Sequence, residues 1–212
     1  MFLTDSVNRA VRRVPAWPIY TVGAALPVWL LWRGTTGGLG VDPVKAIEDT
    51  LGLWGLKLIV VGLCISPLRR AFGVNLIKYR RAIGLLTFFY ILLHFLAWIV
   101  LDMGLLWGQA LSDIVKRPYI TVGMAGLLAM VPLALTSNDW SVRKLGAARW
   151  QRLHLLTYPA AVTGAVHYLW LVKAWPLEPV LYLAAIIALT GLRTILKRRA
   201  TRPSNPFYSA GT

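Results

Sequence analysis

The sequence predicts an all-α polytopic membrane protein in which a six-helix bundle crosses the bilayer. Hydrophobic residues make up 57% of the chain and charged residues only 15%, which is well below the share in soluble domains. Uncharged apolar runs of about 20 residues, long enough to cross a hydrocarbon core about 30 Å thick, recur along the sequence. One compact bundle accounts for the whole length, because no repeat or second domain is visible.

The apolar runs divide the chain into a short start, a membrane domain and a tail. Residues 1–14 are polar and basic, residues 15–196 form the expected membrane domain, and residues 197–212 are expected to be disordered. The glycines of residues 33–50 fit a plain loop rather than a phosphate-binding motif, and residues 102–117 are mildly amphipathic, as in a surface segment. The six expected spans are residues 15–32, 51–67, 82–101, 118–136, 153–172 and 177–196.

The formal charge of +15 is explained by topology rather than by nucleic acid. Basic residues lie in short loops, 17 of them at the two termini and the second and fourth loops, against five on the opposite side. The positive-inside rule then predicts that both termini lie in the cytoplasm. The lipid bilayer is the expected partner of the apolar spans. The single cysteine, Cys64, excludes an intramolecular disulfide and a cysteine-based cluster, and it reads as a buried inert thiol.

All three histidines lie inside the expected third and fifth spans, which indicates that they are ligands. His94 follows Arg81 by 13 residues and His167 follows Arg152 by 15, so both lie roughly 20 Å from the cytoplasmic end of their helices. Two imidazoles at one depth on parallel helices can bind one iron from opposite faces, as in a low-spin haem. We therefore expect haem between the third and fifth spans, with His94 and His167 as its ligands.

The third histidine, His154, predicts a second haem site near the cytoplasmic surface. It lies about 19 Å from His167 along the helix axis, which leaves room for a second haem. The residue at the matching position of the third span is Arg80, a poor iron ligand that is suited to haem propionates or to a weakly held distal position. On an ideal helix His154 and His167 point apart, so we predict a bend at Pro159.

Two simpler interpretations compete with these assignments. The histidines can form hydrogen bonds between helices, for example in a proton path, because polar groups inside a bilayer need partners. Arg80 can be one more cytoplasmic arginine of the topology signal.

Several motifs then resemble one family. RRAIGLLTFFYILLHFLAW, KRPYITVG and LTSNDWSVRKLGAARWQRLHLLTYPAAVTGAVHYLW, with SPLRR before them, are similar to the MsrQ (YedZ) family, the haem-binding membrane subunits of bacterial methionine sulfoxide reductase systems. The resemblance covers roughly residues 45–200 and extends to the wider ferric-reductase-like transmembrane group. Members of that group carry two histidines on each of two helices, whereas this chain has Arg80 at one of the four positions.

The resemblance implies more than spacing does. It implies a multi-pass protein of the bacterial inner membrane that passes electrons from the quinone pool, or from a cytoplasmic flavin reductase, through haem b. The implied acceptor is MsrP, a periplasmic molybdopterin enzyme that reduces methionine sulfoxide in oxidised proteins. The family is also credited with FMN, for which no residue can be assigned. The chain would then be an electron-transfer subunit whose catalytic partner is a separate protein.

Two other functions compete with this one. A stand-alone ferric or cupric reductase would use the same haem, and a haem-free transporter or membrane scaffold would use none. The absence of a dinucleotide fingerprint in the sequence favours a reductant that is oxidised at the membrane or by a partner.

Overall fold

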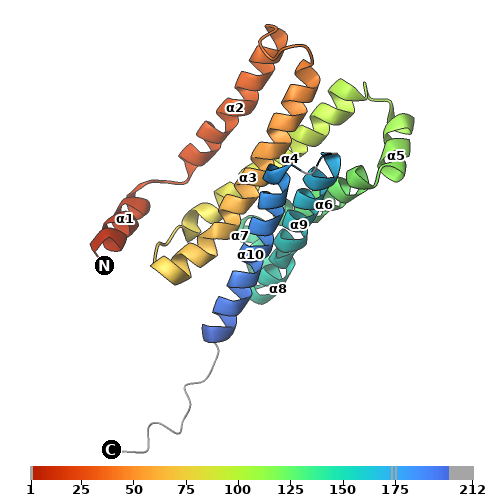
Figure 1. Ribbon diagram of the computed structural model, residues 1–212. Helices are drawn as coiled ribbons and strands as arrows, with labels where there is room; N and C mark the ends of the chain where they lie inside the picture. Colours follow the sequence, from red (N-terminus) through yellow and green to blue (C-terminus); the bar gives the residue numbers. More distant parts are fainter. Residues whose placement is uncertain (1, 173, 175, 201–212) are drawn as a thin grey trace, which may run out of the picture.

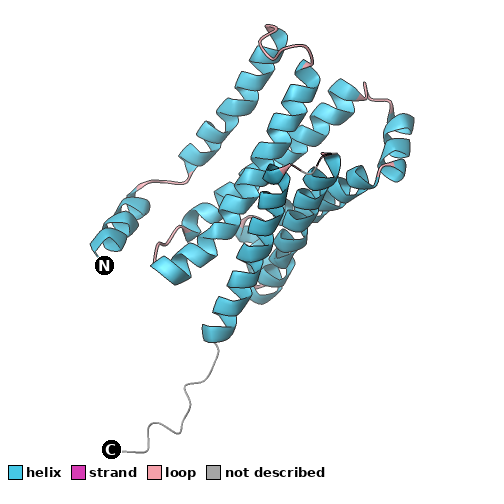
Figure 2. Cartoon of the chain, in the orientation of Figure 1, coloured by secondary structure: helices cyan, strands magenta, loops and turns pink. Residues whose placement is uncertain are grey.

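The computed structural model describes residues 2–172, 174 and 176–200, and within these residues the chain forms helices and loops without a strand. Figure 1 and Figure 2 show long helices packed side by side, with both ends of the described chain at the same end of the bundle. The α-helices are α1 (Phe2–Arg13), α2 (Trp17–Thr35), α3 (Pro43–Phe72), α4 (Arg80–Leu96), α5 (Trp107–Lys116), α6 (Pro118–Leu135), α7 (Asp139–Leu145), α8 (Ala147–Leu153), α9 (Thr157–Leu171) and α10 (Leu177–Ala200).

Three short segments of other helix types interrupt this series. The 3₁₀ turn η1 (Ile77–Tyr79) leads into α4, the π-helical segment η2 (Ala97–Asp102) continues α4, and the 3₁₀ turn η3 (His154–Leu156) separates α8 from α9. The fifth expected span is therefore not a straight α-helix. The sequence predicted a bend at Pro159; the structure has the 3₁₀ turn η3 just before this proline, and the bend itself stays a prediction.

The membrane character of the fold is confirmed, whereas six spans are not. In the described chain four helices are long and apolar enough to cross a bilayer. A fifth span is counted if α1 and α2, which meet at an angle of 79°, are taken together. The segment α9 is only 15 residues long because η3 takes up the preceding turn.

The second expected span begins earlier than the hydropathy pattern indicated. Asp42 caps α3 by accepting a hydrogen bond from the Lys45 backbone N–H at 3.0 Å, and Pro43 occupies the first helical position. The helix then continues to Phe72 and ends at Gly73, whose φ of 71° is in the left-handed region. Much of the stretch expected to be a loop is therefore helix, and α2 also extends into it as far as Thr35.

Two further expectations concern the segment after the third span and the C-terminal tail. The amphipathic stretch after the third span contains α5, whose exposed residues include Trp107, Leu111 and Val115. The helix α10 continues to Ala200, and residues 201–212 lie outside the described residues, so the disordered tail stays a prediction.

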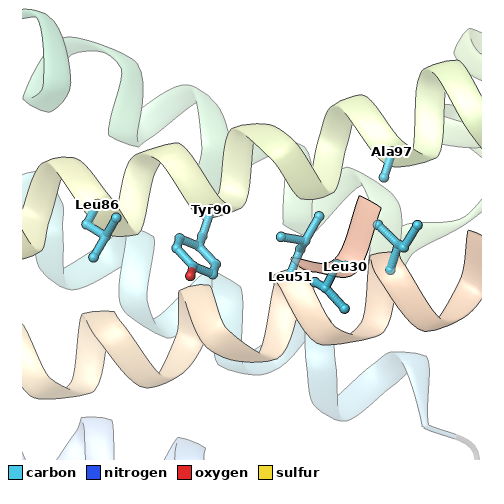
Figure 3. Packing of buried hydrophobic residues seen from close by; sticks show 6 residues of the cluster. Leu30, Leu51, Leu86, Tyr90 and Ala97 are labelled. Carbon is cyan, nitrogen blue, oxygen red and sulfur yellow. The ribbon is translucent and has the colours of Figure 1, made fainter. Parts of the chain in front are cut away.

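Two apolar clusters hold the helices in place. The first joins α2, α3 and α4 and is drawn in Figure 3, where Tyr90 and Leu86 of α4 face the neighbouring helices. The Tyr90 hydroxyl donates a hydrogen bond to the Gly23 carbonyl at 2.6 Å, which ties α4 to α2. The second cluster joins α3, α9 and α10 around Ala161 and Ala165, which are fully buried. Small side chains at this spacing let neighbouring helices approach closely.

The helix α1 is attached to the loop before α4. Asn8 donates to the Gly73 carbonyl and accepts from the Asn75 backbone N–H, at 3.0 and 2.9 Å. The Tyr79 hydroxyl donates to the carbonyl of Val14 at the end of α1. These contacts fix the start of α4, where Arg80 lies.

Candidate metal and cofactor site

A cavity of about 790 Å³ lies between α3, α4, α6 and α9. Its deep wall is apolar and includes Leu56, Ile59, Leu127 and Met130. Small residues of α9, such as Ala160, also line the cavity. A largely apolar space between helices is the usual setting of a bound cofactor in a helical bundle.

His94 on α4 and His167 on α9 both line this cavity, so the structure brings together the two residues predicted to share one metal. Their ring centres are 6.1 Å apart and the ring planes are inclined at 74°. Two imidazoles bonded to one metal ion at about 2 Å each have ring centres about 6 Å apart. The observed spacing therefore fits one metal ion between the rings.

Backbone carbonyls of the neighbouring helices hold both rings. His94 Nδ1 lies 2.9 Å from the Glu48 carbonyl of α3, and His167 Nδ1 lies 2.7 Å from the Tyr119 carbonyl of α6. A carbonyl oxygen only accepts, so each Nδ1 carries the proton and donates it. The lone pair of each ring is then on Nε2, which is the tautomer that a metal needs.

Two glycines make room for these rings. A Cβ at Gly123 would lie 2.8 Å from His167 Nδ1, and a Cβ at Gly52 would lie 3.1 Å from His94 Nδ1. Any larger residue at these positions would displace the imidazoles. The glycines therefore belong to the site, although they carry no functional group.

The charged residues that line the cavity near α5 are mostly acidic: Glu48, Asp49, Asp102 and Asp113 against Lys45 and Arg117. Lys45 pairs with Asp49 at 2.9 Å, and Arg117 pairs with Asp113 at 3.4 Å. Glu48 also faces this region, and its Oε1 is buried without a hydrogen-bond partner among the described residues. This part of the cavity consequently holds no surplus of positive charge.

His154 is not part of this cavity and occupies a separate position in η3. Its ring stacks on Trp150, with centres 3.7 Å apart and planes inclined by 26°. Nδ1 lies 3.1 Å from the Trp150 carbonyl and must donate to it, so the lone pair is on Nε2. That Nε2 is buried, and the Leu133 backbone is close enough to interact with the imidazole.

The 3₁₀ turn changes the direction in which His154 points. Thirteen residues of ideal α-helix leave His154 and His167 about 140° apart, since each residue turns the chain by about 100°. Three residues at about 120° each reduce this difference to about 80°. Pro159 accounts for the turn, because it has no N–H for the Leu155 carbonyl and its ring crowds that carbonyl.

Arg80, the fourth predicted site residue, begins α4 at the end of the bundle where His154 lies. It is within electrostatic reach of His154 and makes no ion pair with another described residue. The structure thus places Arg80 near His154 and away from the cavity of His94 and His167, and its role in holding a cofactor stays a prediction.

The donor set fits a macrocyclic cofactor better than a bare ion. The described residues offer no group of three or more histidine, cysteine, aspartate or glutamate side chains that could hold a metal. Two opposed imidazoles in an apolar cavity leave the other coordination positions to the cofactor itself, as in a haem with two histidine ligands. His94, His167 and the cavity between them fit such a group.

Sequence reasoning missed several residues that shape these sites. Glu48 and Tyr119 act through backbone carbonyls, and Gly52 and Gly123 act through the absence of a side chain, so none of the four has a residue-type signature. Trp150 could have been found, because residues four apart on a helix lie on one face and Trp150 is four residues before His154.

Comparison with known proteins agrees with this architecture. The model of the family described as ferric reductase like transmembrane component matches residues 51–165. Proteins of Brucella ovis, Brucella canis and Brucella suis named protein-methionine-sulfoxide reductase heme-binding subunit MsrQ are each 51% identical to this chain over 173 residues. The matched region covers 82% of this chain and 78% of each relative. No solved structure matches the chain. The chain belongs to the MsrQ family of ferric reductase like transmembrane components.

Proposed function

We propose that this protein is the haem-binding membrane subunit of a protein-methionine-sulfoxide reductase system and that it carries electrons across the membrane. The observation that carries the proposal is the pair of opposed imidazoles, His94 and His167, whose Nδ1 atoms are both held by carbonyls. The relatives' printed name, which specifies a heme-binding subunit, supports the same role.

Each part of the site has a physical task in this function. A bound b-type haem supplies a centre that gains and loses one electron reversibly. His94 and His167 would hold its metal, and the carbonyls of Glu48 and Tyr119 keep the proton on Nδ1 of each ring, so that Nε2 remains available as the ligand atom. The apolar wall, including Leu127 and Met130, excludes water and shields the centre from side reactions. No step of this function requires another catalytic group on the chain.

We further propose that the chain crosses the bacterial inner membrane six times, with both termini in the cytoplasm. The bent α1–α2 unit and the η3–α9 unit then serve as spans alongside α3, α4, α6 and α10. The distribution of basic residues supports this orientation, since 17 of them lie at the end that holds the termini. The cavity with His94 and His167 is then the outer site, and His154 marks an inner site.

The inner site extends the proposal to two haems. His154 would hold the metal through Nε2, and Arg80, which is within electrostatic reach of His154, would pair with propionates or support a weakly held distal position. Two centres at different depths would divide the crossing of the membrane into shorter electron transfers.

The electron donor and the electron acceptor are proposed from membership of the MsrQ family. Electrons would come from the quinone pool or a cytoplasmic flavin reductase and pass to the periplasmic molybdopterin enzyme MsrP, which reduces methionine sulfoxide in oxidised proteins. FMN, a further cofactor proposed by family, has no assigned residue. The absence of any extramembrane domain in the described chain supports an acceptor that is a separate protein.

Haem quantification in purified variants tests the proposal. Wild type should bind haem, and His94→Ala and His167→Ala should lose the same haem while retaining any second one. Leu93→Ala and Val166→Ala are matched controls, because each removes the neighbouring apolar side chain and leaves the imidazole in place. Wild-type protein without a haem absorbance band, together with a harmless His94→Ala, would exclude electron transfer and leave the transporter or scaffold.

A reconstituted assay tests the partner. Reduced protein in vesicles should be reoxidised by added MsrP and methionine sulfoxide, and this oxidation should fail in His94→Ala. Rapid oxidation by ferric or cupric chelates, with none by MsrP, would replace the proposed acceptor by a metal substrate.

A further inference from the structure

The helix α3 carries a lysine in the middle of its membrane-spanning part. This helix is among those long and apolar enough to cross a bilayer, and Lys57 is the one charged residue within residues 51–67. By the helical rise, Lys57 lies about 12 Å along the axis from Asp49 and about 18 Å from Arg69, the nearest charged residues on either side. Lys57 is therefore well inside the apolar part of the span, where an ionisable side chain is costly and generally serves a function.

Lys57 is half-buried and lies on the face of α3 that the other described helices leave open. One buried face of α3, with Leu51, packs on α2 and α4, and another, with Leu63, packs on α9 and α10. Trp54 and Val61, three residues before and four residues after Lys57, are 41% and 50% exposed. Residues at these spacings share one side of a helix. In a spanning helix this side faces lipid, so it is open to molecules dissolved in the bilayer.

The Lys57 ammonium has an aromatic neighbour but no ion pair with another residue of the described chain. Its Nζ lies 5.1 Å from the centre of the Trp54 ring, which is a cation–π contact. Trp54 is itself about 7 Å along the axis from Asp49, so the lysine side chain lies against the indole rather than beside the charged end of the helix. A cation in an apolar setting needs a hydrogen-bond acceptor, and a ligand from the bilayer would supply one.

Trp54 also connects this lipid-facing side to the cavity of His94 and His167. It lines the cavity together with Thr50, which lies one turn away on the same side of α3. Gly52, between these two residues in the chain, contacts the imidazole of His94. A ligand held by Lys57 and Trp54 would therefore be separated from the cavity only by residues of α3.

We propose that Thr50, Trp54 and Lys57 bind the head group of a lipid-soluble quinone. This rests on the proposed function, which names the quinone pool as a donor, and it assigns the place where that donor binds. A quinone head group is a flat ring with carbonyl oxygens at two opposite edges, and its isoprenoid tail dissolves in the bilayer. The Thr50 hydroxyl and the Lys57 ammonium lie one turn to either side of Trp54, so each can donate a hydrogen bond to one carbonyl.

The depth of Lys57 favours a quinone over a phospholipid head group. Lipid phosphates lie outside the hydrocarbon core, whereas a neutral quinone carbonyl enters it at a much smaller cost. A second aromatic–cation pair, Trp29 and Arg33 of α2, provides a contrast. The Arg33 guanidinium is 5.8 Å from the centre of the Trp29 ring and already donates to the Gly38 carbonyl at 2.7 Å, and neither residue lines the cavity. That pair fits an anchor at the membrane surface.

Binding of a short-chain quinone to the purified, haem-loaded protein in detergent tests this inference. Isothermal titration with a ubiquinone that carries one isoprene unit should show saturable binding to the wild type. Lys57→Met should weaken this binding about tenfold, because a charge-assisted hydrogen bond is lost. Trp54→Leu should weaken it about fivefold and Thr50→Val about threefold. Lys57→Arg keeps the charge and the donors, so it should retain most of the affinity.

Trp29→Leu is the matched control for the loss of an indole. Trp29 is 48% exposed and lies beside a cation, as Trp54 does, but it does not line the cavity. Its variant should bind the quinone as tightly as the wild type. Haem content is measured in every variant, and Lys57→Met should keep all of its haem, which separates a lost quinone site from a damaged cavity.

Several results would overturn the inference. They are the absence of saturable quinone binding to the haem-loaded wild type, an unchanged affinity in Lys57→Met, and an equal weakening in Trp29→Leu. Loss of co-purified phospholipid phosphorus in Lys57→Met, at unchanged quinone affinity, would also overturn it by assigning the lysine to a lipid head group. Failure of the proposed function is distinguishable, because the wild type would then lack a haem absorbance band whatever its affinity for quinone.

Discussion

Gly123 of α6 lies against the imidazole of His167, so closely that a Cβ there would be 2.8 Å from Nδ1. The corresponding distance from Gly52 of α3 to His94 Nδ1 is 3.1 Å. Each histidine therefore contacts a backbone carbonyl and a glycine of one adjacent helix. The space between the glycine and the imidazole is smaller at His167 than at His94.

This difference predicts a graded response to alanine. Gly123→Ala should displace His167 and lower haem retention about tenfold or more, and Gly52→Ala should have a smaller effect because the contact is longer. Helix stability should not fall, since alanine favours a helix by about 1 kcal/mol over glycine. Haem content and melting temperature are measured together. Gly84→Ala on α4, where a Cβ meets nothing within 4 Å, should leave haem content unchanged.

Pro159→Ala should affect the two haem levels unequally. Alanine restores the N–H that can bond the Leu155 carbonyl, so the 3₁₀ turn can relax into α-helix and rotate His154 by about 60°. We expect the inner haem to be lost and the haem of His94 and His167 to remain. Pro132→Ala, which changes a proline within α6, is the control. Loss of both haems, or of neither, would contradict this account of η3.

Trp150 should hold His154 by its ring more than by its N–H. Trp150→Phe keeps an aromatic face for stacking and removes only the bond from Nε1 to the Thr136 carbonyl, whereas Trp150→Leu removes both. An aromatic pair contributes about 0.5–1.5 kcal/mol. The electron paramagnetic resonance signal of the inner haem should broaden in Trp150→Leu and stay close to wild type in Trp150→Phe. Equal broadening in both would assign the effect to the hydrogen bond instead.

The pair formed by Arg81 and Asp139 predicts a pH dependence of stability. Arg81 donates a hydrogen bond to Asp139 and pairs with it at 2.5 Å, which holds the pKa of the Asp139 carboxyl below its ordinary value. The pair therefore stabilises the protein above the unfolded pKa of about 3.9, and its contribution is lost as pH falls through the lower folded pKa. Because the pair is exposed, the effect should be small.

Melting temperatures from pH 7 to pH 3 in detergent check this. Asp139→Asn and Arg81→Gln should each lower stability at pH 7 and flatten the curve at the acid end, and the double variant should do no more than either single one. Additive losses in the double variant would show that the two side chains act separately.

The sequence predicted the apolar middle of the helices better than their ends. Hydropathy detects the lipid-facing turns, so it missed the first turns of α3, where Lys45 and Glu48 are polar but Asp42 caps the helix. The histidines could be paired by depth because helical rise is constant. Their supporting carbonyls could not, because which carbonyl meets which ring depends on how closely two helices approach.

Both histidines of the cavity, His94 and His167, are hydrogen-bonded to the helix that packs most closely on their own. His94 of α4 is bonded to α3, and His167 of α9 is bonded to α6, while contacts between these two helix pairs are much sparser. A metal bound by both imidazoles would therefore link the pair α3 and α4 directly to the pair α6 and α9. Without its cofactor the protein should lose this direct link, and the two helix pairs should then be held together mainly through α10, which packs on both α3 and α9.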